Sequence, residues 1–117
     1  MIVITGSESF VGKELISQLK NNYKIIGFDT VNTKSNEYIF HQIDIRNSNI
    51  EELIPENADA VIHLAALSRD PDCKGKSFEC FDINVMGTLN LIRAAIKKNV
   101  KQFIFASSEW VYNEFKE

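Results

Sequence analysis

The residues with the clearest chemical potential lie near the start of the chain, in the segment Val-Ile-Thr-Gly-Ser-Glu-Ser-Phe-Val-Gly at positions 3–12. A short β-branched run leads through a glycine turn directly into a helical pattern, which is typical of sites for the diphosphate of a dinucleotide. The first N–H groups of a helix lack intrahelical partners, and the helix dipole adds partial positive charge there. The segment therefore predicts a diphosphate-binding turn, with a plain structural turn as the alternative.

Three small residues give this turn its shape. Gly6 would let the backbone turn sharply, and Gly12 would let the helix pack close to the strand. Ser9 stands where such motifs usually carry a middle glycine, so the motif is imperfect. A serine is small enough to fit, and we expect its hydroxyl to offer one more hydrogen-bond donor.

Two acids follow later strands at positions suited to an adenosine. Asp29 ends the second predicted strand, where a carboxylate can accept hydrogen bonds from both ribose hydroxyls and repel a 2′-phosphate. This favours NAD over NADP, with an Asp that merely opens a turn as the alternative. Asp44 could accept from the adenine amino group with Ile45 flanking the ring, and a turn residue at the end of a strand is the alternative.

Four further polar residues are candidates for structural or chemical roles. His63 lies in an apolar run, which favours a buried, neutral, hydrogen-bonded imidazole over a catalytic one. Asn84 sits in a predicted helix, where it could hydrogen-bond a neighbouring loop or face solvent. Ser107 and Ser108 follow the last predicted strand, where a hydroxyl could bond a substrate oxygen, with solvated loop serines as the alternative.

The elements that would position these residues alternate between strands and helices. Apolar runs predict strands over residues 1–5, 24–28, 38–43, 60–64 and 102–106. Helices are predicted over residues 10–22, 48–54 and 77–96, with Ser77 as the cap of the last helix and a loop over residues 70–75. The apolar faces of the first and last helices are expected at Val11, Leu15, Ile16 and Leu19, and at Phe81, Val85, Leu89, Ile92 and Ile96.

Continuous apolar strands separated by helices imply an α/β fold with a parallel sheet covered on both faces. Right-handed crossovers make this a doubly wound sheet with the predicted strand order 3-2-1-4-5. Ligands bind such sheets at the carboxyl ends of the strands, near the switch point between strands 1 and 4. Five candidates fall at carboxyl ends: Gly6, Asp29, Asp44, Leu64 and Ser107.

Composition narrows the class of protein. The chain has 117 residues, which suits one domain, and its net charge of −3 argues against a nucleic-acid partner. No apolar run is long enough to span a bilayer, and the chain enters a strand without a signal peptide, so we expect a cytoplasmic protein with no membrane partner. Cys73 and Cys80 have no metal-ligand spacing with the histidines, so we expect free thiols and no metal.

The chain resembles the extended short-chain dehydrogenase/reductase family, the NAD-dependent epimerases and dehydratases that act on nucleotide sugars. Six segments carry the resemblance in order along the chain: Thr5–Gly12, Asp29, Asp44–Arg46, Val61–Ala66, Asn84–Leu91 and Phe105–Tyr112. The resemblance implies a Rossmann-like sheet that is incomplete relative to the family. It also implies NAD as cofactor, a nucleotide-sugar substrate in a longer form of the protein, and a homodimer as an open expectation.

The resemblance implies roles for the matching positions. Gly6, Ser9, Phe10 and Val11 would meet the pyrophosphate, Asp29 the ribose, and Asp44 with Ile45 the adenine. Leu64, Ala65, Ala66 and Ser107 would lie along the rest of the cofactor. Ser108 matches the family's catalytic Ser/Thr, which polarises an oxygen of the sugar.

One departure from the family concerns the base. The family's Tyr-x-x-x-Lys belongs on a later helix, which is expected beyond Glu117 together with the last strands and the sugar-binding domain. Tyr112 and Lys116 have the right spacing, but Tyr112 lies only four residues after Ser108, so we interpret this match as a coincidence. We therefore expect residues 1–117 to be the NAD-binding domain alone, and inactive by itself.

The reaction and the function class stay open between named alternatives. The 4,6-dehydratases use an Asp-Glu pair where this chain has Glu109-Trp110, and Trp110 cannot replace an acid, so 4-epimerase chemistry is favoured. The alternative function is a non-catalytic module that binds or senses NAD(H). A Rossmann-like methyltransferase is a third interpretation, but it would not need Ser107 and Ser108 after the fifth strand.

Overall fold

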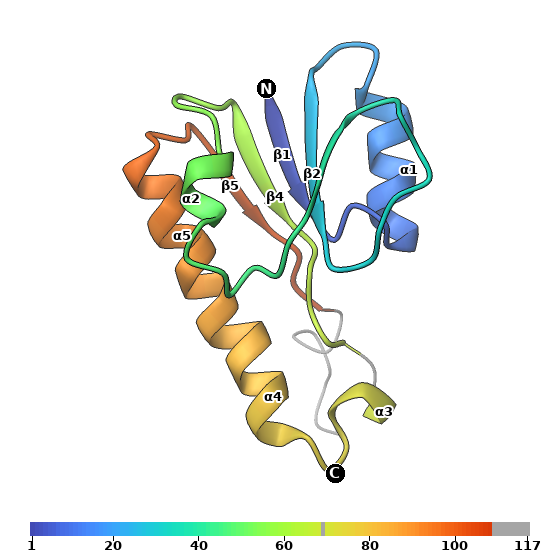
Figure 1. Cartoon of the computed structure of the whole chain (residues 1–117), viewed down its shortest axis with the longest axis vertical. Helices are drawn as coiled ribbons and strands as arrows, with labels where there is room; N and C mark the ends of the chain where they lie inside the picture. The colour runs from blue at the N-terminus through green and yellow to red at the C-terminus, as the bar shows by residue number, and fades with distance from the viewer. Residues whose placement is uncertain (69, 109–117) are drawn as a thin grey trace, which may run out of the picture.

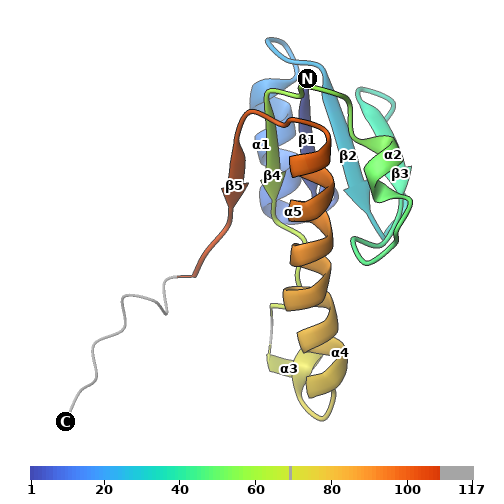
Figure 2. The ribbon, with the colours of Figure 1, turned by 90° about the vertical axis from the view of Figure 1, so that its left-hand side faces the viewer.

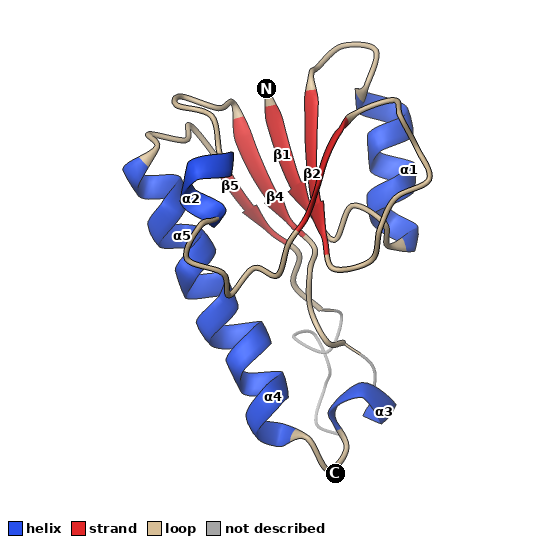
Figure 3. Cartoon of the chain, in the orientation of Figure 1, coloured by secondary structure: helices blue, strands red, loops and turns tan. Residues whose placement is uncertain are grey.

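The computed structural model describes residues 1–68 and 70–108 and shows a five-stranded parallel sheet between layers of helices (Figures 1 and 3). Its strands are β1 (Ile2–Thr5), β2 (Ile25–Asp29), β3 (Ile39–Gln42), β4 (Ala60–His63) and β5 (Phe103–Phe105). Their order is β3-β2-β1-β4-β5, which confirms the predicted topology. The central strand β1 pairs with β2 and β4, and this register places Thr5 between Phe28 and His63.

Helices cover both faces of the sheet, and those after β1 and β3 are shorter than predicted. They are α1 (Phe10–Leu19), α2 (Ile50–Leu53), α3 (Asp70–Cys73), α4 (Ser77–Phe81), the π-helical stretch η1 (Asp82–Gly87) and α5 (Thr88–Lys97). Helix α1 lies on one face, while α2 and the continuous helix from α4 to α5 lie on the other (Figures 1 and 2). In the part of the chain that the structure describes, no helix is long and apolar enough to cross a membrane.

The alternation of side chains along β1 divides the core into two clusters. Ile2 and Ile4 point toward α1 and pack with Ile16, whereas Val3 points to the opposite face and packs with Leu91 of α5. Burial on both faces explains why the central strands are apolar without interruption. Because helices pack on both faces of the sheet, the strand ends and the loops that follow them are held in fixed positions.

The segment between β4 and α4 differs from the prediction. Residues predicted as a loop form the short helix α3, and a disulfide joins Cys73 to Cys80 with a Cα–Cα distance of 5.6 Å. The expectation of free thiols was therefore wrong. The turn between α3 and α4 brings the two cysteines within the range that a disulfide spans, which their separation of seven residues did not reveal.

The helix that begins at Ser77 also corrects two expectations. Its N-cap residue is Lys76, which makes no capping bond through its side chain, so Ser77 is the first helical residue and not the cap. Its buried face consists of Cys80, Gly87, Leu91, Ala94 and Ala95. The apolar stripe expected at Phe81, Val85, Leu89 and Ile96 is exposed instead. In α1, Val11 is likewise exposed, and the buried residues are Gly12 and Ile16.

Candidate functional site

A groove of about 700 Å³ runs along the carboxyl ends of the strands and over the N-terminus of α1. It is the place where the strand order reverses between β1 and β4, which is where doubly wound sheets bind ligands. Most predicted cofactor contacts line this groove: Gly6, Ser9, Phe10, Asp29, Asp44, Ile45, Leu64, Ala65 and Ala66. The fold thus brings together residues that are up to 60 positions apart in the chain.

The glycine turn after β1 has the geometry that a close ligand approach requires. Gly6 has φ of +69°, in the left-handed region that favours glycine. A Cβ on Gly6 would lie 3.0 Å from the backbone nitrogen of Ala65 and 3.1 Å from the carbonyl carbon of Leu64. The turn therefore packs directly against the segment that follows β4, and both form one wall of the groove.

Ser9 caps helix α1. Its hydroxyl accepts a hydrogen bond from the Gly12 N–H at 3.1 Å and donates to the Gly6 carbonyl oxygen at 2.6 Å. The hydroxyl proton is therefore engaged inside the turn and is not the extra donor that we expected for a ligand. Ser9 has φ of −72°, so its backbone conformation does not require a glycine either.

We expect Ser9→Gly to be tolerated and to keep or tighten cofactor binding, because a side chain beside the diphosphate takes up room. The lost cap should cost a few tenths of a kcal/mol in the glycine variant and about 1 kcal/mol in Ser9→Ala. Urea unfolding gives the stabilities and calorimetric titration gives the affinities. Markedly weaker NAD binding by Ser9→Gly at near-parental stability would show that the hydroxyl is a ligand, against this interpretation.

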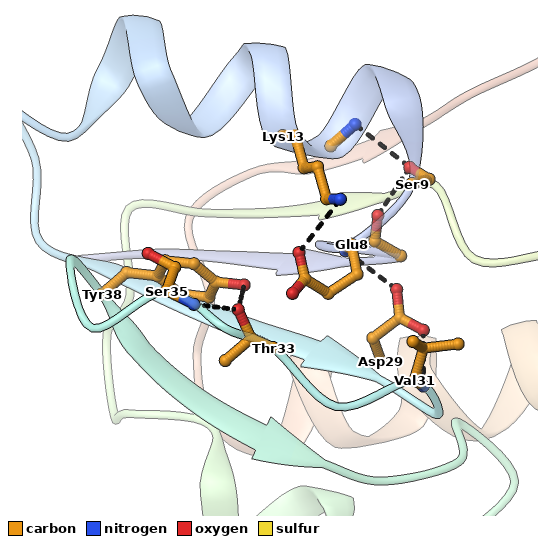
Figure 4. Close-up of polar contacts among 10 residues, drawn as sticks. Glu8, Ser9, Lys13, Asp29, Val31, Thr33, Ser35 and Tyr38 are labelled. Atoms are coloured by element: carbon orange, nitrogen blue, oxygen red, sulfur yellow. Dashed lines mark hydrogen bonds and ion pairs between the residues drawn. The ribbon is translucent and has the colours of Figure 1, made fainter.

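Asp29 ties the end of β2 to the glycine turn. Its carboxylate accepts hydrogen bonds from the N–H of Glu8 at 2.9 Å and from the N–H of Val31 at 3.0 Å (Figure 4). Each carboxylate oxygen has a second lone pair, so the group keeps capacity for the hydroxyls of a ribose. The Glu8 residue also lines the groove, and its carboxylate lies 4.0 Å from the Lys13 ammonium, which offsets its negative charge.

Asp44 belongs to an ion-pair network. Its carboxylate accepts three hydrogen bonds from Arg46, and the Arg46 guanidinium also pairs with Asp82 at 2.9 Å. The side-chain hydrogen bond from Arg46 is the main reason that the pKa of the Asp44 carboxyl is below its usual range. Ile45 lines the groove but is 5% exposed, and its side chain mainly packs into the core beside Gly87.

Three predicted residues do not line the groove. Val11 is 58% exposed on α1, and Ser107 and Ser108 are exposed on the segment after β5. Glu109, Trp110 and Tyr112 lie outside the described residues. The groove therefore gathers most of the residues predicted for the cofactor, and Ser107 and Ser108 are not among the residues that line it.

His63 is buried beneath the groove, where it is 2% exposed, and does not line it. Burial lowers the pKa of its imidazole to about 4, so the ring is neutral near pH 7. The predicted buried, neutral histidine is therefore confirmed. The predicted contact of Asn84 with a neighbouring loop is confirmed as well, because its side chain bonds the backbone of Leu67.

Several residues that line the groove were not predicted from the sequence, because the fold brings them there from different elements. Glu8, Leu67, Asp72 and Ile83 join the lining because the turn, the segment after β4 and the π-helical stretch converge there. The position of Glu8 inside the glycine segment was a usable signal. Asp72 and Ile83 gave none, since their place depends on how α3 and η1 fold back over the strand ends.

Comparison with known proteins supplies the family. The family model for the NAD dependent epimerase/dehydratase family matches residues 2–117. The chain belongs to this family. A UDP-glucose 4-epimerase of Klebsiella pneumoniae is 32% identical over 128 residues, covering 97% of this chain and 92% of that protein. The bifunctional UDP-glucose 4-epimerase and UDP-xylose 4-epimerase 3 of Arabidopsis thaliana is 31% identical, covering 97% of this chain and 38% of that one.

Solved structures agree with this family assignment. A short-chain dehydrogenase/reductase superfamily protein from Agrobacterium tumefaciens, crystallised with bound NAD, superposes with a TM-score of 0.84. It is 28% identical, and the match covers 96% of this chain and 34% of that one. The chain thus spans little more than a third of the length of this protein and of the Arabidopsis relative. The Rossmann-like fold and NAD as the cofactor of the family agree with the prediction.

Proposed function

We propose that this chain is the NAD-binding part of a nucleotide-sugar 4-epimerase. The single observation that carries the proposal is the groove in which the glycine turn, the N-terminus of α1 and Asp29 meet at the switch point of the sheet. These parts fit a dinucleotide, because Phe10 at the N-terminus of α1 lines the groove, where helix N–H groups favour a diphosphate, and Asp29 offers a carboxylate at the end of β2. The family and the names of the relatives support the nucleotide-sugar substrate.

The proposed contacts follow the groove from end to end. We assign the pyrophosphate to the turn formed by Gly6, Ser9, Phe10 and Val11, with the N–H groups of Phe10 and Val11 at the start of α1 as the donors. The Gly6 and Ser9 N–H groups shape the turn instead, because they donate to the carbonyl oxygens of Phe28 and Gly6. Asp29 binds the ribose, and Asp44 and Ile45 bind the adenine. Leu64, Ala65 and Ala66 support the middle of the cofactor, and Ser107 lies toward the nicotinamide end. Asp44 shares its carboxylate between Arg46 and the adenine amino group, since each oxygen accepts more than one hydrogen bond.

The proposed reaction divides the work between cofactor and protein. When held in the groove, NAD would supply the hydride acceptor for oxidation at the sugar C4 and the hydride donor for reduction at the other face. Ser108 would hydrogen-bond the sugar oxygen, but a serine hydroxyl alone is a weak base. A tyrosine whose phenol is activated by a nearby lysine would take the proton, and its reference pKa of about 10 shows why the lysine is needed. We assign this role to no residue that the structure describes.

Replacing Asp29 should weaken NAD binding by about 1–3 kcal/mol, because charged hydrogen bonds to the ribose are lost and the Glu8 and Val31 N–H groups lose their acceptor. Calorimetric titration of Asp29→Ala against the parent chain measures the loss. Asp59→Asn is the matched control, since Asp59 pairs with the N-terminal amino group at the opposite end of the strands. Equal weakening by both variants would assign the effect to net charge and refute the ribose role of Asp29.

We expect the 117-residue chain to bind NAD without turning over nucleotide sugars, because Tyr112 follows Ser108 by only four residues, which is too near for the tyrosine of a separate helix. A coupled assay with UDP-glucose and NAD tests this. Activity that disappears in Tyr112→Phe would contradict the proposal and identify Tyr112 and Lys116 as the base pair. Binding of NAD without turnover also fits the second candidate, a sensing module. A longer reading frame with another Tyr-x-x-x-Lys decides for the enzyme.

The same proposal includes a cytoplasmic homodimer with no nucleic-acid or membrane partner. The exposed apolar side chains of Phe81, Val85 and Leu89 on the helix from α4 to α5 support association with a second copy.

A further inference from the structure

A chain of hydrogen bonds beneath the groove connects β1, β4 and α5. Thr5 Oγ1 accepts the N–H groups of Leu64 and Ala65, each at 3.1 Å. These two bonds use both lone pairs of the hydroxyl oxygen. The Thr5 hydroxyl hydrogen is therefore donated to His63 Nδ1, which lies 2.7 Å away.

The hydrogen bond from the Thr5 hydroxyl fixes the tautomer of His63. Because Nδ1 accepts from Thr5, the neutral ring carries its one hydrogen on Nε2. Nε2–H donates to Thr88 Oγ1 at 2.8 Å, and the Thr88 hydroxyl donates to the Asn84 carbonyl oxygen at 2.7 Å. From the Thr5 hydroxyl onward, each donor points toward the helix, and the Leu64 and Ala65 N–H groups fix this direction by filling the lone pairs of Thr5 Oγ1.

A second anchor holds the other end of the same segment. The Asn84 side chain accepts the Leu67 N–H at 2.8 Å and donates to the Leu67 carbonyl oxygen at 2.9 Å. Asn84 lies in the π-helical stretch η1, which is directly continuous with Thr88 at the start of α5. The backbone of residues 64–67 is thus fixed to Thr5 at one end and to Asn84 at the other.

We propose that His63, Thr88 and Asn84 are positioning residues for the cofactor, which hold residues 64–67 as a preformed wall of the groove. Leu64, Ala65, Ala66 and Leu67 all line it, whereas His63 does not. Preorganisation of this wall removes an ordering cost from binding. The inference rests on the proposed function, because the groove is assumed to be the NAD site.

Two variants separate the hydroxyl and amide anchors. Thr88→Val keeps the shape of the side chain and leaves the His63 Nε2–H without an acceptor, so we expect NAD affinity to fall about fivefold. Thr88→Ser restores the hydroxyl and should bind within about twofold of the parent. Asn84→Asp replaces the donor to the Leu67 carbonyl oxygen by a carboxylate and should weaken binding about tenfold, whereas the exposed Asn22→Asp adds the same charge without effect.

Amide hydrogen exchange distinguishes positioning from general stability. In Thr88→Val and Asn84→Asp we expect faster exchange at Leu67 with unchanged exchange at Ile4 in the central strand. Parental NAD affinity in both variants, or exchange that rises equally at Leu67 and Ile4, would overturn the inference and leave the proposed function standing. Absence of NAD binding by the unaltered chain would overturn both.

Discussion

Gly12→Ala is expected to destabilise the chain by about 3 kcal/mol or more. A Cβ at this position would stand well inside contact distance of the Gly6 carbonyl oxygen, and 3.0 Å from the Cα and carbonyl oxygen of Ser7. These neighbours are backbone atoms of the turn, so they cannot rotate away. Helix α1 would have to lift from β1, and the diphosphate site would be lost with it.

Urea unfolding of Gly12→Ala beside Gly75→Ala tests this account. Gly75 has φ of +73° with no atom within 4 Å of an added Cβ, so its replacement should cost only the conformational strain of about 1 kcal/mol. The comparison separates a steric clash from backbone strain. A Gly12→Ala variant as stable as Gly75→Ala would contradict the close packing of α1 on the turn.

Acidification should remove about 3 kcal/mol of stability through His63 alone, because its pKa is lowered to about 4 in the fold from about 6.5 in the unfolded chain. The contribution is fully present above pH 6.5. As pH falls, the unfolded chain binds the proton first, so stability decreases from pH 6.5 down to pH 4 and then levels off. Burial is the main cause, and a protonated Nδ1 would also find the Thr5 lone pairs already occupied.

The ring resonances of His63 give this pKa directly by NMR titration, with an expected midpoint near 4. Unfolding free energies of the parent and of His63→Gln between pH 8 and pH 4 measure how much of the loss of stability is due to the protonation of His63. The parent should lose more stability than the variant as the pH falls. A midpoint near 6.5 for the folded chain would show that the imidazole is solvated and that the hydrogen-bond chain beneath the groove is absent.

The sheet could be predicted because each strand is recognised from its own residues. Each central strand is a continuous apolar run bounded by polar residues, and two-sided burial leaves no other place for such runs. The positions of the strand ends follow from the strands, so the sequence predicts that Gly6, Asp29 and Leu64 converge, and all three line the groove. The mismatches at element ends are small, since terminal residues fray and caps decide them.

The parts that could not be predicted depend on long-range contacts. Cys73 and Cys80 meet only because α3 folds, and its four residues Asp-Pro-Asp-Cys show no helical periodicity from which a helix could be predicted. The helix after it has two apolar faces, and the sequence does not say that Leu91, Ala94 and Ala95 face the sheet. Smaller residues there permit close packing, while the larger stripe faces outward.

The candidate site also contains residues that could be predicted from the sequence and residues that could not. Its glycines and Asp29 carry a motif at fixed spacing, so sequence reasoning found them. The contact between Asn84 and Leu67 spans 17 positions and was predicted only as a contact with some neighbouring loop. The engagement of the Ser9 hydroxyl by Gly6 and Gly12 escaped prediction, because a cap and a ligand donor use the same residue type.

Calorimetric titration of the unaltered chain with NAD and with NADP tests the central claim most directly. In the proposed binding mode, Asp29 places negative charge where a 2′-phosphate would lie, and the glycine turn faces the pyrophosphate that both dinucleotides share. We expect saturable binding of NAD that is at least tenfold tighter than that of NADP, about 1.4 kcal/mol. Tighter binding of NADP, or no binding of either dinucleotide, would contradict the account.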